Sequence, residues 1–331
     1  MASTLSNREV LLASIATRIA DYRKGEVPAP DSAHVDKWIS QFERNVQEPI
    51  LAEFDHVLQK TYIAKPEVKT FLTNLATNTK LAGSDPTAFW RSANFLKIQG
   101  GGNSQIEMLQ MFDRVLQKTC GLSVDDCGSE RGPYIYLDDV IFSGNRVKND
   151  VSSWVTSSAP EKGKLHVVVI AFHKGGRYYA ETKINGACAS AMKSLNVSWW
   201  RSLELEDRKA FVNNSDVLRP SSLASDAMTQ NYVKGLKYPP VIRQGKGVGE
   251  NELFSSDTGR CVLEQEFLKA GLEIRDRCPH LIAYQRPLGN MVLASLGFGT
   301  LVVTFRNCPN NAPLALWAGN PWYPLFPRKT N

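Results

Sequence analysis

Two adjacent carboxylates, Asp138 and Asp139, follow the apolar and aromatic run 134–137 near the middle of the chain. Such a run predicts a buried strand of an α/β sheet, and in open sheets of this class ligands bind beyond the carboxyl ends of the strands. The small residues 143–145 come next and precede an amphipathic helical pattern. A turn that leads into a helix offers backbone N–H groups to phosphate, whereas carboxylates bind hydroxyl groups or a metal ion. A phosphorylated ribose presents both kinds of group.

This segment resembles the ribose-phosphate signature of the type I phosphoribosyltransferases, which consists of a hydrophobic strand, two acidic residues and a short Ser/Thr-Gly loop. The resemblance implies that Asp138 and Asp139 hold the ribose hydroxyls of phosphoribosyl diphosphate and act in catalysis. It also implies that the 5′-phosphate lies in a loop formed by Ser143, Gly144, Asn145 and Arg146. Arg146 stands where the family usually has Thr. A guanidinium at this position pairs with phosphate but alters the pocket.

A second loop precedes the carboxylates by about forty residues and takes the place of the diphosphate-binding loop in the same family. It contains Lys97 and the glycine triplet Gly100, Gly101 and Gly102. Glycine lets a backbone approach phosphates closely, and the lysine adds a positive charge. We therefore expect a diphosphate-binding loop, with a flexible turn as the alternative. Mg²⁺ is expected to bridge the diphosphate and ribose oxygens, so that Asp138 and Asp139 act on the ion only through the ligand.

A polar segment near the C-terminus follows another apolar run and offers possible contacts to a base or a phosphate. Its candidate side chains are Arg306, Asn307, Asn310 and Asn311. Arginine binds phosphate or carboxylate in a bidentate manner, and asparagine amides suit a base edge. The alternative is a turn of Asn and Pro residues held by hydrogen bonds within the loop.

The segments 286–289, 297–300, 306–313 and 38–42 together resemble a group of bacterial phosphoribosyltransferase-like proteins predicted to act in antiviral conflict systems, including some retron loci. This resemblance extends over nearly the whole chain. It implies an effector or sensor role in defence and not nucleotide salvage.

An apolar strand that ends in two carboxylates also occurs in other classes of protein. A Walker B strand has such an end, but it requires an upstream G-x-x-x-x-G-K-[ST] loop, which the chain lacks. A receiver domain carries its acidic pair near its start, not after a hundred residues. A purely structural acidic strand end is the third possibility and remains open.

Hydrophobic periodicity predicts two regions. Residues 1–85 follow helical spacing and form an N-terminal helical region, either a cap on the sheet or a docking surface. Residues 86–331 alternate strand and helix, which predicts a type I phosphoribosyltransferase-like parallel sheet flanked by helices, with a last strand at 300–305. Residues 205–258 interrupt the alternation and are expected to form an inserted lid or hood.

Composition narrows the class of protein further. The net charge of +6 suits a phosphate-bearing ligand or an acidic partner, and it is not concentrated in one run. There is no apolar run long enough to cross a membrane and no apolar signal segment after Met1, so we expect a cytoplasmic protein without a membrane partner. The six cysteines lack zinc-site spacing and are expected to be reduced.

These features predict a protein that binds a ribose-phosphate or nucleotide ligand with Mg²⁺ and acts at ribose C1, by phosphoribosyl transfer or by cleavage of a nucleotide's glycosidic bond. Two alternatives remain. One is a nucleotide sensor that catalyses nothing, and the other is a docking subunit for a protein or nucleoprotein partner from the same defence system. The acceptor does not follow from the sequence.

Overall fold

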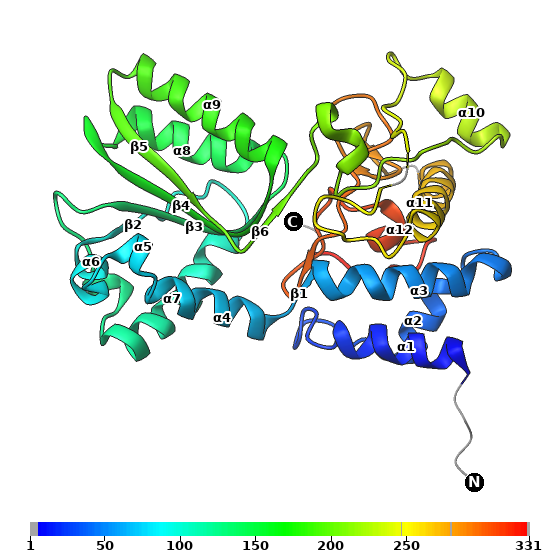
Figure 1. Cartoon of the computed structure of the whole chain (residues 1–331), viewed down its shortest axis with the longest axis horizontal. Coiled ribbons are helices and arrows are strands. Elements are labelled where there is room, and N and C mark those ends of the chain that lie inside the picture. Colours follow the sequence, from blue (N-terminus) through cyan, green and yellow to red (C-terminus); the bar gives the residue numbers. More distant parts are fainter. Residues whose placement is uncertain (1–5, 246, 279, 330–331) are drawn as a thin grey trace, which may run out of the picture. The chain divides into compact units, whose positions relative to one another are not determined.

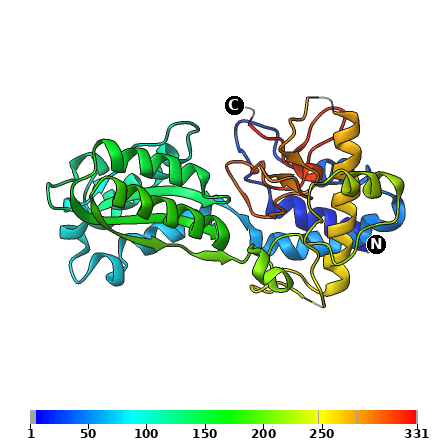
Figure 2. The same cartoon turned by 90° about the horizontal axis from the view of Figure 1, so that it is seen from above.

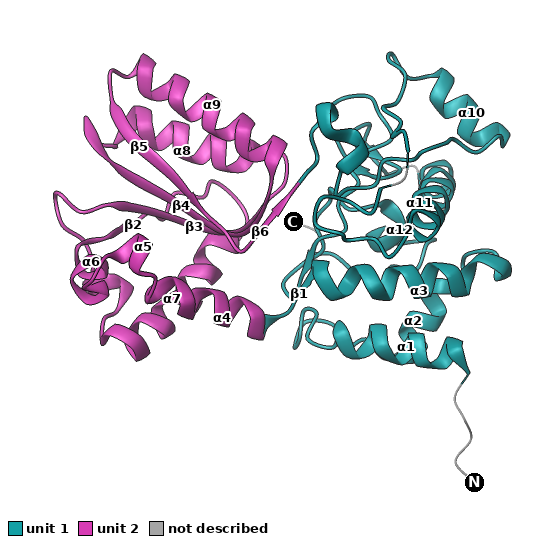
Figure 3. Ribbon diagram, viewed as in Figure 1, with its two compact units in different colours: residues 1–65, 206–331 teal, residues 66–205 magenta. Residues whose placement is uncertain are grey.

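The computed structural model describes residues 6–245, 247–278 and 280–329. The chain divides into two compact units, shown in Figure 3. Unit 1 consists of residues 1–65 and 206–331, and unit 2 consists of residues 66–205. The boundary predicted between residues 85 and 86 does not coincide with this division, because residues 66–85 pack within unit 2 and residues 206–331 return to unit 1.

Unit 2 is built on a parallel sheet. Its strands are β2 (Asn94–Phe95), β3 (Tyr134–Ile141), β4 (Lys162–His173), β5 (Ser194–Trp200) and β6 (Leu203–Leu205). The strand order is β2-β3-β4-β5, and β6 pairs with the last residues of β4. Every pairing in this sheet is parallel. Because β4 has neighbours on both edges and helices on its faces, its residues from 167 to 173 are all buried, as expected for a continuous apolar run.

Helices lie on both faces of this sheet, as Figures 1 and 2 show. One face packs against α8 (Asn145–Ser157) and α9 (Lys174–Ser190), and the opposite side carries α6 (Pro86–Ser92) and α7 (Ser104–Cys120). Unit 2 is completed by α4 (Lys65–Ala76), α5 (Thr79–Ala82) and the 3-10 helix η1 (Val124–Asp126). The predicted fold class, a parallel sheet flanked by helices, is therefore confirmed.

Unit 1 is mainly helical. Its helices are α1 (Asn7–Arg18), α2 (Ser32–Ile39), α3 (Arg44–Thr61), η2 (Lys209–Asn214), α10 (Ala227–Lys234), α11 (Asp257–Arg277) and α12 (Leu314–Trp317). Trp38 of α2 is fully buried, and its ring lies 5.6 Å from Phe54 of α3 and 6.3 Å from Phe267 of α11. This aromatic cluster joins helices from the two ends of the chain into one core.

Two short strand pairs complete unit 1. They are β1 (Tyr62–Ile63) with β9 (Val303–Thr304), which is parallel, and β7 (Gln285–Arg286) with β8 (Gly289–Asn290), which is antiparallel. The last strand predicted at 300–305 is thus shorter than expected, and it pairs with Tyr62 and Ile63 instead of joining the large sheet. Of the predicted lid 205–258, residues 206–258 lie in unit 1, and the function of the segment as a lid stays a prediction.

Candidate functional site

Asp138 and Asp139 lie near the carboxyl end of β3, the position that the sequence predicted for a ligand site. The strand continues past them to Ile141, and the bend 142–144 leads directly into α8. Adjacent residues of a strand point to opposite faces, so the two carboxylates leave β3 on different sides. Asp138 is only 4% exposed, whereas Asp139 is half-buried.

Asp138 sits in an environment that penalises its charged form. Burial and, second, the negative charge of Asp139 raise its pKa to about 7. Hydrogen bonds from the Ser104 side chain, the Asp139 backbone N–H and the Tyr136 hydroxyl oppose this shift; the Asp139 N–H donates to Asp138 Oδ1 at 2.9 Å. At neutral pH, Asp138 is therefore present partly as the protonated acid and partly as the carboxylate.

A third carboxylate, Asp150 of α8, belongs to the same cluster. The hydroxyl of Tyr136 lies 3.3 Å from Asp138 Oδ2 and 3.1 Å from Asp150 Oδ2. Burial first, and then the two carboxylates, raise the pKa of Tyr136, so its hydroxyl stays protonated. A phenol carries one hydrogen and satisfies only one carboxylate. A proton on Asp138 lets the second contact become a hydrogen bond as well.

Asp150 was not among the predicted site residues, although the sequence contains a signal for it. Val147, Val151 and Trp154 mark the buried face of the helix, and Asp150 falls on the same face at helical spacing. An acidic residue among apolar positions of a core-facing stripe is unusual enough to suggest a paired or functional carboxylate.

The predicted phosphate loop has the backbone that its sequence requires. Gly144 has φ +77°, and a Cβ atom there would lie 2.1 Å from the carbonyl oxygen of Gly176 in α9. Only glycine fits this contact. Helix α8 begins at the next residue without a side-chain cap, and Ser143, Asn145 and Arg146 are exposed around its first turn. Uncapped N–H groups at a helix start suit an anion.

The predicted diphosphate loop lies against the same helix. The N–H of Gly100 donates to Asp150 Oδ1 at 3.2 Å, and a Cβ atom at Gly101 would lie 3.2 Å from Nη1 of Arg146. Gly102 has φ +81°, a conformation that side chains disfavour. The structure therefore brings together the two loops that the sequence predicted separately, at one edge of the sheet in unit 2.

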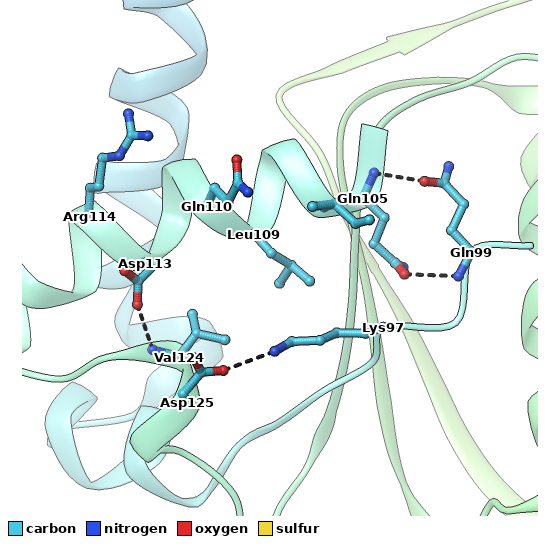
Figure 4. A pocket seen from close by; sticks show the side chains of 10 residues that line it. Lys97, Gln99, Gln105, Leu109, Gln110, Asp113, Arg114, Val124 and Asp125 are labelled. Atoms are coloured by element: carbon cyan, nitrogen blue, oxygen red, sulfur yellow. Dashed lines mark hydrogen bonds and ion pairs between the residues drawn. The ribbon is translucent and has the colours of Figure 1, made fainter. Parts of the chain in front are cut away.

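Lys97 has a different environment from the glycines that follow it. Its ammonium forms an exposed ion pair with Asp125 at 2.9 Å, as Figure 4 shows. Exposed pairs of this kind contribute roughly 0–1 kcal/mol, so the pair opens at little cost. A diphosphate contact by Lys97 stays a prediction and requires that opening.

A cavity of about 530 Å³ adjoins Lys97. Gln99 and Gln105 hold its wall: each backbone N–H donates to the other residue's side-chain oxygen at 3.1 Å (Figure 4). Gln105 is 1% exposed, and its Nε2 has no hydrogen-bond partner. The cavity is lined by Lys97, Gln99, Gln105, Ile106, Leu109, Gln110, Asp113, Arg114, Val124 and Asp125.

The C-terminal candidates lie in unit 1, where three of them, Asn307, Asn310 and Asn311, form hydrogen bonds with other residues of the chain. Asn311 is 8% exposed, and its Nδ2 donates to the carbonyl of Asn290 at 2.9 Å. Asn310 accepts from the backbone N–H of Asn290, and Asn307 Oδ1 accepts from the backbone N–H of Lys329. Arg306 is half-buried. Contacts of these residues with a base or phosphate stay predictions.

No group of three or more His, Cys, Asp or Glu residues suited to a metal ion occurs among the residues that the structure describes. The predicted arrangement, in which Asp138 and Asp139 hold ligand hydroxyls and Mg²⁺ is bound by ligand oxygens, stays a prediction. In the same described ranges, no helix has the length and apolar character needed to span a membrane.

The PRTase-CE family model matches residues 35–328, which is nearly the whole chain. The chain belongs to the PRTase-CE family. It is accordingly a phosphoribosyltransferase-like protein, in agreement with the parallel sheet and with the acidic strand of unit 2. No curated protein and no solved structure matches it. The PRTase-CE match includes parts of both units, so unit 1 is also part of the family's sequence.

Proposed function

We propose that unit 2 binds a ribose-phosphate ligand, either phosphoribosyl diphosphate or a nucleotide, together with Mg²⁺, and that it acts at ribose C1. The observation that carries this proposal is the meeting of the Gly100–Gly102 loop, the uncapped start of α8 and Asp138 at one edge of the sheet. In this proposal the phosphate-binding backbone and the hydroxyl-binding carboxylates act on one phosphorylated sugar.

In this proposal the ribose hydroxyls contact Asp138 and Asp139, and the 5′-phosphate lies at Ser143, Gly144, Asn145 and Arg146. The diphosphate takes the Gly100–Gly102 loop, with Lys97 released from Asp125. Loss of diphosphate from C1 builds positive charge on the sugar ring and negative charge on the leaving group. The nearby carboxylates stabilise the first, and backbone N–H groups stabilise the second. Mg²⁺ supplies charge neutralisation at the ligand oxygens.

A nucleotide would react by the same route, with its base as leaving group and water as acceptor. We place this chemistry in the cytoplasm and in bacterial antiviral defence, as the resemblance to conflict-system and retron-associated proteins implies.

A nucleotide sensor without turnover is the second candidate. It is favoured by Arg146, which is exposed on the first turn of α8 and directed at the position of Gly101. A permanent cation at this point holds a phosphorylated ligand tightly in its ground state, and tight ground-state binding does not accelerate a reaction.

Titration calorimetry with phosphoribosyl diphosphate and Mg²⁺ tests the proposal. Saturable binding is expected for the wild type and is expected to be lost in the double variant Asp138→Asn/Asp139→Asn. Asp276→Asn, which changes an exposed carboxylate of α11, is the control and is expected to bind normally. Continued heat after saturation supports the enzyme over the sensor. A folded wild type that binds neither phosphoribosyl diphosphate nor nucleotides contradicts both.

A further inference from the structure

A basic hollow lies at the opposite, amino-terminal edge of the same sheet in unit 2. Its volume is about 870 Å³. The lining comes from α5, from α6, from the loop before β3 and from the starts of β4 and β5. It consists of Lys80, Leu81, Ala82, Gly83, Phe89, Arg131, Gly132, Pro133, Lys162, Gly163, Lys164, His166, Ser194 and Asn196. Because parallel strands share their direction, this edge is remote from the carboxyl ends that carry the ribose-phosphate site.

Four cations surround this hollow: Lys80, Arg131, Lys162 and Lys164. All four are exposed, and none of the described residues that line the hollow is acidic. None of the four has an ion pair within the described part of the chain. Four exposed positive charges around one concave surface produce a local field that attracts phosphate.

The strand register explains why polar groups gather beside these cations. Lys162 pairs with Ser194, and Lys164 pairs with Asn196 across β4 and β5. Paired residues of parallel strands project to the same face, so two ammonium groups, a hydroxyl and an amide form one polar surface. This is the face opposite α8 and α9, since Leu165 and Val167 pack toward those helices.

Aromatic rings border the same surface. Phe89 is half-buried, and its ring lies 6.0 Å from that of His166. Burial and then Lys164 lower the pKa of His166 to about 4, so it is neutral at pH 7 and supplies a ring instead of a charge. Its Nδ1 accepts from the indole N–H of Trp200 at 3.2 Å, which fixes the orientation of the ring.

We propose that this hollow binds single-stranded nucleic acid, with Lys80, Arg131, Lys162 and Lys164 on successive phosphates and Phe89 available for base stacking. Exposed cations that follow a backbone, together with an aromatic platform, are the features that hold single strands without reading their sequence. A free mononucleotide fits less well. Pockets for small ligands are predominantly apolar and enclose most of the ligand, whereas these cations are spread around a polar rim.

Fluorescence anisotropy of the full chain with a labelled single-stranded oligonucleotide of about 15 nucleotides tests this inference, since single-strand sites span roughly 4–16 nucleotides. The variant Lys162→Gln/Lys164→Gln removes two cations from the hollow. We expect it to weaken binding by about tenfold and to lower the slope of log affinity against log salt by about 1.4, which corresponds to two released counterions.

The control is Lys69→Gln/Lys118→Gln, which removes two exposed lysines from α4 and α7 of the same unit. Its affinity is expected to stay within about twofold of the wild type, because these lysines lie outside the hollow. Equal losses in the two double variants would mean attraction by net charge alone and would overturn the inference. So would a wild type that does not bind the oligonucleotide.

Two competition experiments identify the occupant and the location. A mononucleotide at an equal concentration of phosphate is expected to displace little of the oligonucleotide; complete displacement would mean a nucleotide pocket instead. Saturating phosphoribosyl diphosphate with Mg²⁺ is also expected to leave the oligonucleotide bound. Displacement by that ligand would place the oligonucleotide at Asp138 and Asp139 and would overturn the separate site, whether or not the proposed function holds.

Discussion

The two units each bury charged side chains, but they differ in the partners that surround the buried carboxylates. In unit 1 the carboxylate of Glu264 is fully buried between two arginines, with Arg260 Nε at 2.8 Å and Arg243 Nη2 at 3.1 Å. In unit 2 the buried carboxylates Asp138 and Asp150 share one tyrosine hydroxyl, and no ion pair joins either of them to a cation in the described part of the chain.

Under the proposed function, this difference separates a structural cluster from a ligand-binding one. A buried charge with hydrogen-bonded counter-charges holds its neighbours in place, and removing one member leaves the others buried without a counter-charge. A buried pair of like charges reduces stability, and such pairs persist where a ligand supplies the missing partners. The cluster in unit 1 is therefore complete without a ligand, whereas under the proposed function ribose hydroxyls would supply the hydrogen-bond donors for the cluster around Asp138.

The largest effect on stability is expected from disrupting the cluster of Glu264 with Arg243 and Arg260. Glu264→Gln keeps the side-chain shape but leaves Arg243 and Arg260 with less negative charge beside them, so unfolding should become easier by about 3–5 kcal/mol. Urea denaturation measures this change. The control Glu273→Gln, on the exposed side of the same helix and 3.8 Å from Arg277, should change stability by less than about 0.5 kcal/mol. A loss below about 1 kcal/mol for Glu264→Gln would mean that the cluster is not structural.

The phosphate loop should show the next largest effect. Gly144→Ala places a methyl group 2.1 Å from a backbone oxygen and requires φ +77°, so we expect a loss of about 2–4 kcal/mol and greatly weakened ligand binding. Thermal unfolding and calorimetry measure the two quantities. Gly186→Ala in α9 meets no atom within 4 Å and should instead stabilise by roughly 0.4–1 kcal/mol. If the two variants behaved alike, the close packing of Gly144 against α9 would be refuted.

The cluster around Asp138 should make the free energy of unfolding depend on pH. Because burial and Asp139 raise the pKa of Asp138 to about 7, the folded chain holds this proton more tightly than the unfolded chain. The free energy of unfolding therefore falls as pH rises from about 4 to about 7 and then levels off. Asp138→Asn removes this term, so its stability relative to the wild type should rise by on the order of 1–2 kcal/mol between pH 5 and pH 8. Denaturation curves at both pH values that give the same difference would contradict this assignment.

The smallest change in stability is expected at the exposed pair of Lys97 and Asp125. Lys97→Ala should cost less than about 1 kcal/mol of stability, and Asp125→Ala should behave similarly. If Lys97 moves to the diphosphate, the two variants should differ in ligand affinity: Lys97→Ala should bind more weakly by about tenfold, whereas Asp125→Ala should bind at least as well as the wild type. Unchanged affinity in Lys97→Ala would remove this residue from the site.

The sequence was sufficient to predict the part of the fold that depends on local pattern. The apolar run before Asp138 predicted β3, and the helical spacing of residues 1–85 predicted helices such as α2, where the carboxylate of Asp31 accepts from the N–H of His34. The glycines of the 100–102 loop predicted a backbone that can approach phosphates closely, and that role stays a prediction. These features are encoded within a few residues of each other.

The remaining features depend on contacts between distant residues. Val303 pairs with Tyr62, a partner that no local pattern identifies, and the prediction that the last strand joins the large sheet was therefore wrong. Asp150 was missed because its importance comes from Tyr136 and Gly100, which lie on other elements. The basic hollow likewise arises from the register of β4 with β5, since its lysines form no conspicuous run.

The most direct test of the contrast between the two clusters is a count of the protons released when Mg²⁺ and phosphoribosyl diphosphate bind. Calorimetry at pH 7, in two buffers with different ionisation enthalpies, provides this number. With the pKa of Asp138 near 7 in the free chain, bound hydroxyl donors and Mg²⁺ should lower that pKa and release up to about half a proton from the wild type. Binding heats that do not depend on the buffer, or an equal release from Asp138→Asn, would contradict the conclusion that the ligand completes this cluster.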